Sequence, residues 1–289
     1  MWRKYLFPAT VREALEMVAA HRGESQIIAG GTDLVLQSKR GQCPATVIVD
    51  ITRIPDLDFI VERDGFIAIG CQVTHAQVAA SSLIRQKAEV LALACGSVGG
   101  PATRNVGTLV GNVVNALPAA DGAIALFALD AEAEVADANG RRWTPIAELY
   151  AGVGQCVLDP CAQMVTAIRF HPLGPGQASA YQRLANRKAL ALPTLAVGAA
   201  VGIKDGVCNE ARVAMGPVAP TPLRAREAEA ALRGQPPTAA AIAHAADLAQ
   251  QAARPRHSLL RGSSDYRRAM VGVLVRRALT EAVAKAEGR

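Results

Sequence analysis

A pair of adjacent glycines near the start of the chain separates one short apolar segment from the next. The run is Ile27-Ile28-Ala29-Gly30-Gly31-Thr32-Asp33-Leu34. β-Branched residues precede the glycines and helix-forming residues follow them, so we expect a strand over 26–29, a tight turn, and a helix over 34–39. Without Cβ atoms the main chain can approach a ligand, and the start of the helix carries partial positive charge. The turn suits a phosphate or pyrophosphate, although plain glycine turn chemistry explains the same residues.

Length and hydropathy limit the class of protein. The chain has 289 residues, enough for two domains, and 51% of them are hydrophobic. No segment approaches the run of about eighteen apolar residues that a membrane helix needs. The first eight residues are too aromatic, and their apolar part is too short, for a signal peptide. We therefore expect a cytoplasmic protein without a membrane span.

The cysteines and histidines form no recognisable metal site. The six cysteines occur singly in apolar segments, which is typical of reduced core thiols. Cys156 and Cys161 have the spacing that opens a plant-type iron–sulfur motif, but Met164 occupies the third ligand position. The five histidines match neither HExxH nor a zinc-finger pattern. We predict that this chain carries no metal ion and no iron–sulfur cluster of its own.

The formal net charge of +6 comes mainly from the last third of the chain. Arginines occur there in pairs or close together, at Arg224 and Arg226, Arg267 and Arg268, and Arg276 and Arg277. They could dock an acidic partner or lie on a solvated helix face. No aromatic residues interleave with them, so we do not expect a nucleic-acid surface.

The order of predicted elements indicates an α+β protein in two parts. Alternating proline and glycine over 171–176 read as a linker between the parts. Before the linker we expect a helix that Thr10 caps, further helices over 84–95 and 123–129, and strands over 46–51, 66–69, 133–137, 141–144 and 164–170. After the linker we expect strands over 179–187, 195–204 and 208–215, then helices over about 223–233, 238–252 and 264–286. Strands followed by helices favour an α+β arrangement in this second part.

A second glycine-rich run supports a ligand site. It is Arg104-Asn105-Val106-Gly107-Thr108-Leu109-Val110-Gly111-Asn112, and Asn115-Ala116-Leu117-Pro118-Ala119-Ala120-Asp121 follows. With AGGTDL at 29–34, these motifs resemble the FAD-binding medium subunit of the molybdenum hydroxylases, a family that includes xanthine dehydrogenase and carbon monoxide dehydrogenase. The segment 181–187 is similar to the strand that opens the family's C-terminal domain, and 264–268 to the start of its last helix. The resemblance extends over nearly the whole chain.

The resemblance implies a fold and its division into domains. Residues 1–172 would form a two-part FAD-binding domain of the PCMH/vanillyl-alcohol-oxidase type, with lobes of about 1–55 and 56–172. Residues 177–289 would form a smaller domain like the C-terminal domain of carbon monoxide dehydrogenase flavoprotein, with an antiparallel sheet and helices. The chain lacks the cysteine-rich insert of relatives that hold an additional four-iron cluster.

The resemblance also implies which residues bind FAD. The two glycine turns would meet over the diphosphate, and Asp121 would hold the ribityl or flavin end. One side of the site would consist of Ala29, Gly30, Gly31, Thr32, Asp33 and Leu34, and the other of Thr108, Gly111 and Asn112. Met164 and Arg183 belong to the same implied site, Arg183 near the flavin ring. We expect no catalytic side chain, because the cofactor performs the chemistry and the protein positions it.

Two positions depart from the family pattern. Val110 stands where the family usually has the first glycine of a pair, so the main chain there must reach the ligand despite a Cβ atom. Arg183 replaces the more usual lysine, which keeps the charge but changes its reach and its hydrogen-bond geometry. A cation at this position could stabilise reduced flavin or an electronegative substrate, or it could be a surface residue of the strand.

The resemblance implies an electron-transfer function. FAD on this chain would take electrons from the [2Fe–2S] clusters of a small partner subunit and pass them to NAD⁺, a quinone or another acceptor. A large partner subunit would hold the molybdenum cofactor, and the complex would be a dimer of heterotrimers. Two alternatives remain. One is a self-contained flavin oxidase, which normally needs a larger substrate-binding domain. The other is a non-catalytic assembly module that has lost FAD, for which Val110 is the supporting feature.

Overall fold

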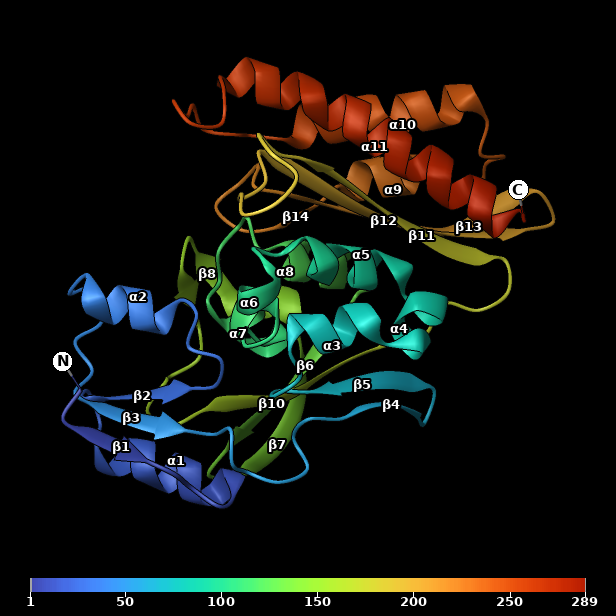
Figure 1. The fold of residues 1–289 in the computed structure, drawn as a ribbon. Coiled ribbons are helices and arrows are strands. Elements are labelled where there is room, and N and C mark those ends of the chain that lie inside the picture. The colour runs from blue at the N-terminus through green and yellow to red at the C-terminus, as the bar shows by residue number, and fades with distance from the viewer. Residues whose placement is uncertain (1, 289) are drawn as a thin grey trace.

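A small parallel sheet begins the chain. The computed structural model describes residues 2–288, and its first sheet has the strand order β1-β3-β2, from Lys4–Leu6 (β1), Val47–Asp50 (β3) and Ser25–Ile28 (β2). Helix α1 (Val11–Ala20) connects β1 to β2, and α2 (Leu34–Lys39) lies between β2 and β3. Thr10 caps α1 as predicted, because its side chain accepts a hydrogen bond from the N–H of Glu13. In Figure 1 this unit is blue, and α2 stands apart from its sheet.

A five-stranded antiparallel sheet forms the middle of the molecule. Its order is β4-β5-β10-β6-β7, from Ile60–Arg63, Phe66–Gly70, Met164–Phe170, Glu132–Asp137 and Gly140–Pro145. The chain between β5 and β6 forms short helices, which are α3 (His75–Ala80), α4 (Ser82–Lys87), α5 (Glu89–Ser97), α6 (Pro101–Arg104), α7 (Leu109–Val114) and α8 (Asp121–Ala128). Between β7 and β10 lie η1 (Ile146–Leu149), β8 (Tyr150–Gly152) and β9 (Gln155–Cys156). Figure 1 shows the short helices above this sheet.

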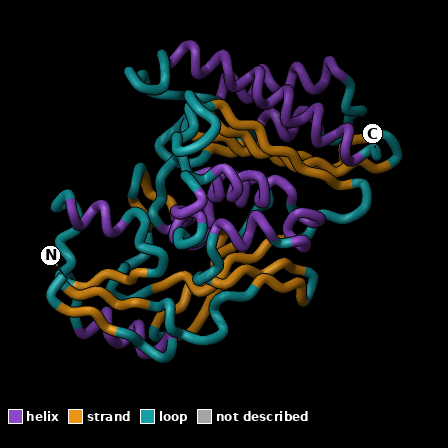
Figure 2. The backbone as a smooth tube through the Cα atoms, viewed as in Figure 1, coloured by secondary structure: helices purple, strands orange, loops and turns teal. Residues whose placement is uncertain are grey.

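The last part of the chain forms a third sheet and the helices that cover it. The sheet order is β11-β12-β13-β14, from Gln177–Leu184, Leu195–Lys204, Val207–Gly216 and Leu223–Arg224, and all pairs are antiparallel. The chain then forms α9 (Arg226–Leu232), α10 (Ala239–Ala252) and α11 (Ser264–Ala286). These three helices cover one face of the sheet, and α5 and α8 pack against the other (Figures 1 and 2). No helix in the described part of the chain has the length and apolar character needed to cross a membrane.

Small residues allow α8 to lie close to the third sheet. Gly198 of β12 faces this helix, and a Cβ atom built on it would lie 3.3 Å from Cβ of Ala128 and 3.2 Å from a methyl group of Val90. Every residue of α8 is buried. Close packing of small side chains brings helix and sheet axes together without cavities. The first residue of α8, Asp121, is thereby held against the strand that carries Tyr181 and Arg183.

The predicted helix over 84–95 is wrong in one respect, because it is interrupted. Ala88 has φ −160° and ψ 53°, and it separates α4 from α5. Other parts of the chain satisfy the freed main-chain groups: the N–H of Leu173 donates to the carbonyl of Lys87, and the N–H of Val90 donates to the hydroxyl of Ser179. An apolar run shows no such interruption, because the partners lie far away in the sequence.

Two further expectations need correction after residue 170. The segment 171–176 has no regular structure, as predicted, but Leu173 within it is buried, so the segment is a packed connection rather than a loose linker. The predicted helix over 223–233 begins only at Arg226, because Leu223 and Arg224 extend the third sheet. The guanidinium of Arg224 is almost fully buried and pairs with Glu229 at 2.6 Å, so it is not on a solvated helix face.

Candidate cofactor site

The first glycine run presents unpaired main-chain donors. Strand β2 ends at Ile28 and helix α2 begins at Leu34. Among the described residues, the N–H groups of Gly30, Gly31, Thr32 and Asp33 donate no hydrogen bond to a backbone acceptor. Gly31 has φ +67°, a conformation that glycine adopts without strain. Consecutive free N–H groups before a helix form a binding site for an anion.

The two glycine runs are in direct contact. A Cβ atom on Gly30 would lie 2.0 Å from the carbonyl oxygen of Val106 and 2.9 Å from Cα of Gly107. Gly107 in turn faces Thr32, whose hydroxyl oxygen would lie 3.3 Å from a Cβ atom on Gly107. Glycine is therefore required at position 30 by the main chain of the second run, whatever ligand lies above the turn.

The polar residues of the second run also fix local structure. Thr108 caps α7, because its hydroxyl oxygen accepts a hydrogen bond from the N–H of Gly111 at 3.0 Å. The side-chain oxygen of Asn112 accepts from the N–H of Ala123 at 3.2 Å, in the first turn of α8. These bonds leave the Thr108 hydroxyl proton and the Asn112 amide protons as donors for a ligand.

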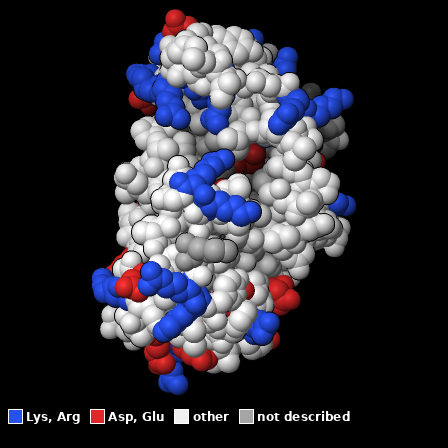
Figure 3. Space-filling model, turned by 60° about the vertical axis from the view of Figure 1, so that its left-hand side comes forward, with Lys and Arg blue, Asp and Glu red and all other residues white. Residues whose placement is uncertain are grey.

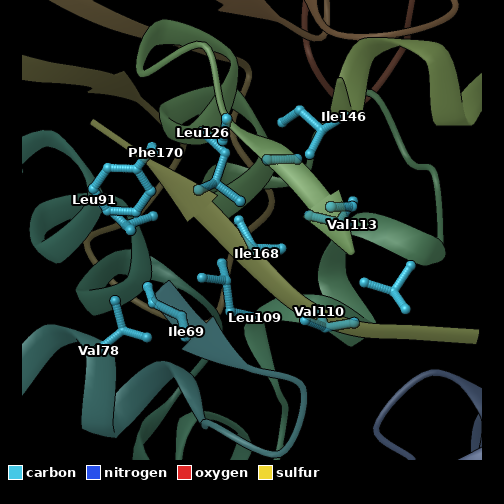
Figure 4. Packing of buried hydrophobic residues seen from close by; sticks show 14 of the residues in the cluster. Ile69, Val78, Leu91, Leu109, Val110, Val113, Leu126, Ile146, Ile168 and Phe170 are labelled. Carbon is cyan, nitrogen blue, oxygen red and sulfur yellow. The ribbon is translucent and has the colours of Figure 1, made fainter. Parts of the chain in front are cut away.

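The side chain of Val110 packs in the core. It is 5% exposed and belongs to the large apolar cluster of the first part of the chain. Figure 4 shows it beneath Val113 at the edge of this cluster, with Leu109 and Ile168 nearby. Val110 is the second residue of α7, and what remains exposed of it borders the cavity described next. Most of the Val110 side chain is therefore accommodated in the core, and a small part of it contributes to the cavity wall.

A cavity of about 360 Å³ opens beside the two runs. Its lining is mostly apolar with polar groups at intervals, and it includes Ile27, Ala29, Thr108, Gly111 and Met164. An apolar cavity with a few polar groups is typical of a site for a flat organic ring. The residues come from the first sheet, the start of α7 and strand β10. Residues far apart in the sequence therefore line the same cavity.

At the other end of the site, Asp121 connects the two parts of the chain. Its Oδ1 accepts hydrogen bonds from the hydroxyl of Tyr181 at 2.6 Å and from Nε of Arg183 at 2.9 Å. Burial raises the pKa of Asp121, whereas Arg183 and Tyr181 oppose this shift. Burial, followed by the Asp121 carboxylate, holds the pKa of Tyr181 well above its usual value, so Tyr181 remains a donor. Arg183 is consequently a nearly buried ion-pair partner, not a surface residue.

A loop of the second part closes this end. The Arg183 guanidinium also donates to the carbonyl of Ala191 at 2.5 Å. The N–H of the neighbouring Leu190 donates to the carbonyl of Gly99 at 3.1 Å, so the loop rests on the turn before α6. In Figure 3 the surface is hollowed between its upper and lower parts, with Lys and Arg side chains on both sides of the hollow and acidic atoms inside it. The charge around this hollow is therefore mixed, with cations at its rim.

The remaining predicted residues are peripheral. Asp33 is exposed in the turn and makes no side-chain capping bond to α2, and partial desolvation raises its pKa. Leu34 is half-buried at the start of the same helix. Sequence reasoning missed Tyr181 as a partner of Asp121, although it did mark the strand that carries it. It also missed His75, which is 2% exposed, and whose main-chain N–H donates to the carbonyl of Gly107 at 2.9 Å.

The burial of His75 predicts a pH dependence of stability. Burial, with a smaller contribution from Arg104, lowers the pKa of His75 from 6.5 to about 4. Between these pH values His75 binds a proton in the unfolded chain but not in the folded chain, so the free energy of unfolding falls as the pH drops. This residue is expected to contribute up to about 3 kcal/mol of that loss, and nothing above pH 6.5.

Urea titrations of the FAD-free chain between neutral pH and pH 4 measure this effect. In the His75→Gln variant the free energy of unfolding should fall less steeply as the pH drops. His257→Gln removes an exposed imidazole and serves as the control. An unchanged slope in His75→Gln would show that burial does not govern the protonation of His75.

Two family models match the chain. The model described as FAD binding domain in molybdopterin dehydrogenase matches residues 2–172. The chain belongs to this family. The model described as CO dehydrogenase flavoprotein C-terminal domain matches residues 179–282. The first match contains both glycine runs and Asp121, and the second contains Tyr181 and Arg183.

Similar proteins confirm this family over nearly the whole chain. The xanthine dehydrogenase FAD-binding subunit of Escherichia coli O157:H7 is 30% identical over 283 residues, which are 97% of this chain and 96% of that protein. The nicotinate dehydrogenase FAD-subunit of Eubacterium barkeri is 32% identical over 240 residues, or 81% of each chain. A chain in the structure of carbon monoxide dehydrogenase from Hydrogenophaga pseudoflava, in a form which lacks the Mo-pyranopterin moiety of the molybdenum cofactor, matches with a TM-score of 0.94, at 30% identity and 98% coverage of each chain.

These matches confirm several predictions. The molybdenum hydroxylase family is confirmed, and so is the α+β fold, with an FAD-binding domain followed by a smaller antiparallel-sheet domain. FAD is confirmed as the cofactor of the family, and the chain is of the oxidoreductase class. The assignment of single residues to FAD stays a prediction.

Proposed function

We propose that this chain binds FAD along the track from the 360 Å³ cavity to Asp121 and transfers electrons within a molybdenum hydroxylase. The free N–H groups of Gly30, Gly31 and Thr32 would hold the diphosphate, with Thr108 beside them. The adenine would enter the cavity that Met164 lines. The flavin end would lie near Asp121 and Arg183.

The contact between the two glycine runs carries this proposal. It places the unpaired N–H groups of 30–33 against the main chain of Val106 and Gly107, which leads directly into Thr108, and N–H and hydroxyl donors suit phosphate oxygens and sugar hydroxyls. The chain offers no competing partner for those N–H groups among its described residues. Residues 30–32 are half-buried and Asp33 is exposed, so a bound diphosphate would take the place of water at these N–H groups.

The cofactor would supply chemistry that side chains lack: FAD takes up electrons singly and releases them in pairs. The protein's own contribution is position and charge. Arg183 is fixed by Asp121 and by the carbonyl of Ala191, so its positive charge stays at one end of the site. A fixed cation in a poorly hydrated site stabilises negative charge that develops close to it.

We further propose that the electrons come from [2Fe–2S] clusters of a small partner subunit, with the molybdenum cofactor on a large one. The assembly would be a cytoplasmic dimer of heterotrimers with NAD⁺ or a quinone as acceptor. Support comes from relatives of the same length, whose names describe an FAD-binding subunit or a medium chain. The same names count against a self-contained oxidase. We also propose a division of the chain into residues 1–172, with lobes of about 1–55 and 56–172, and residues 177–289. The family-model ranges 2–172 and 179–282 support the boundary between these two domains.

Purification of the tagged chain from its native cells tests the subunit assignment. We expect FAD, iron, acid-labile sulfide and molybdenum to elute together with two further polypeptides. The isolated chain should bind FAD but show no flavin reduction by small reducing substrates. Full reduction of the isolated chain by such a substrate, without iron or molybdenum, would instead support the oxidase alternative.

The Gly31→Val variant tests the position of the diphosphate. Gly31 has φ +67°, and a Cβ atom there would lie 2.8 Å from the Ile28 side chain. Gly41 has φ +68° but open space around it, so Gly41→Val introduces the same backbone strain of about 1–2 kcal/mol away from the site. We expect loss of FAD from the purified Gly31→Val protein and full occupancy in Gly41→Val, measured by visible absorption. Full FAD occupancy in both variants would place the diphosphate elsewhere.

A further inference from the structure

The imidazole of His75 lies between the two glycine-rich segments of the site. A Cβ atom on Gly107 would lie 3.6 Å from its Cδ2, and one on Gly122 would lie 3.5 Å from its Cε1. These two ring carbons flank Nε2, so Nε2 lies in the space between Gly107 and Gly122. Side chains at these two positions would cover it. The absence of both Cβ atoms leaves this edge of the ring open.

Polar groups of the proposed FAD site surround the same space. The Thr32 hydroxyl oxygen would lie 3.3 Å from a Cβ atom on Gly107, and the Asn112 side-chain oxygen would lie 3.0 Å from one on Gly122. Gly122 follows Asp121 in the chain. The open edge of His75 is therefore directed between Thr32 and Asn112, which come from the two sides of the site.

The two ring nitrogens have different surroundings. Nδ1 is sealed from solvent and has no hydrogen-bond partner in the described structure. Nε2 also lacks a partner among the described residues, but it is not among the sealed atoms. The residue is only 2% exposed, and part of this small exposed surface belongs to Nε2. An unpartnered ring nitrogen that reaches the site is available to a ligand.

The proton of the neutral ring belongs on Nε2. A neutral imidazole has one N–H, and a buried N–H without an acceptor is rarer and more costly than an acceptor without a donor. Because Nδ1 has no acceptor, the favoured tautomer leaves Nδ1 unprotonated. Burial lowers the pKa of His75 to about 4, so the ring is neutral at physiological pH. Nε2–H is then a hydrogen-bond donor directed at the site.

We propose that His75 donates a hydrogen bond from Nε2 to a diphosphate oxygen of FAD. This inference rests on the proposed FAD site and adds a side-chain donor to its main-chain donors. A neutral imidazole gives direction to the bond without adding a charge, and a bond to an anionic oxygen is stronger than one between neutral groups. The Nδ1 lone pair remains against the protein interior.

Two substitutions distinguish a donor at the position of Nε2 from one at the position of Nδ1. A glutamine amide nitrogen reaches the place of Nε2, whereas the shorter asparagine amide reaches only the place of Nδ1. His75→Gln should bind FAD within about 3-fold of the natural chain, while His75→Asn should bind about 10- to 100-fold more weakly. Fluorescence titration of the FAD-free full chain gives both affinities. Thermal unfolding of the FAD-free variants shows whether each is folded.

ADP is the second probe, because it contains the diphosphate and the adenosine but no flavin or ribityl group. A diphosphate contact predicts that His75→Asn weakens ADP binding by a similar factor. Unchanged ADP binding with weakened FAD binding would move the contact to the ribityl or flavin part and overturn the proposal. Equal FAD affinities for His75→Asn and the natural chain would also overturn it. If the natural chain bound neither FAD nor ADP, the proposed function itself would fail.

Discussion

Gly30→Ala is expected to remove FAD from the protein and to lower its stability by about 3 kcal/mol. The added Cβ atom would lie 2.0 Å from the carbonyl oxygen of Val106, and 2.7 Å from its carbonyl carbon. Both are main-chain atoms, so no side-chain rotation relieves the contact. The two glycine runs must separate, and the donors on either side then no longer converge on one diphosphate.

Gly96→Ala is the matched control for this variant. Gly96 also lacks a positive φ, and a Cβ atom there would make only an ordinary contact, 3.8 Å from Cβ of Ala79. It lies exposed near the end of α5, where alanine is preferred over glycine by about 0.5–1 kcal/mol. Visible absorption gives the FAD content and urea unfolding gives the stability. A Gly30→Ala protein with full FAD content would show that contact between the runs is not needed for binding.

Asp121→Ala is expected to lower stability by about 3–5 kcal/mol and to abolish FAD binding. The substitution leaves Tyr181 without an acceptor and deprives Arg183 of its carboxylate partner, 2.9 Å away. The Arg183 side chain is 12% exposed and that of Asp121 is 5% exposed, so water replaces the lost partner poorly. Removing one member of a buried pair costs more than the pair contributes as a whole.

The control is an ion pair at the surface. Arg12 and Glu16 are 90% and 68% exposed, and Glu16→Ala should cost about 0.5 kcal/mol or less. Urea unfolding of the FAD-free proteins measures both changes. A loss below about 1 kcal/mol in Asp121→Ala would mean that this contact does not hold the two parts of the chain together.

Local sequence signals predicted much of the fold. Leu34–Lys39, Met164–Phe170 and Ser264–Ala286 have the expected bounds, because glycines, β-branched residues and a serine cap act on the nearest residues. The break at Ala88 was missed, since the groups freed on either side of it bond to Leu173 and Ser179, which come from a distant segment. Periodicity reports which face is apolar and says nothing of such remote partners.

The candidate site, like the fold, was predicted only in part from the sequence. The glycine runs identified the turns, but not that Gly30 is required by the carbonyl of Val106. Val110 departs from the family motif, and a sequence does not show that most of this side chain packs in the core at the start of α7. His75 matches no motif, and Tyr181 belongs to a matched strand whose motif does not show its bond to Asp121; their burial beside unpaired or charged groups identifies both. Such residues depend on tertiary contacts.

The most direct test of the central claim is a titration of the FAD-free full chain with FAD, followed by flavin fluorescence and visible absorption. Binding of one FAD per chain is expected, with a thermal stabilisation that rises with FAD concentration. The Gly96→Ala protein should behave in the same way, and the Gly30→Ala protein should bind none. A purified chain without flavin colour that takes up no FAD in this titration would contradict the claim that the two glycine runs form a site for the FAD diphosphate.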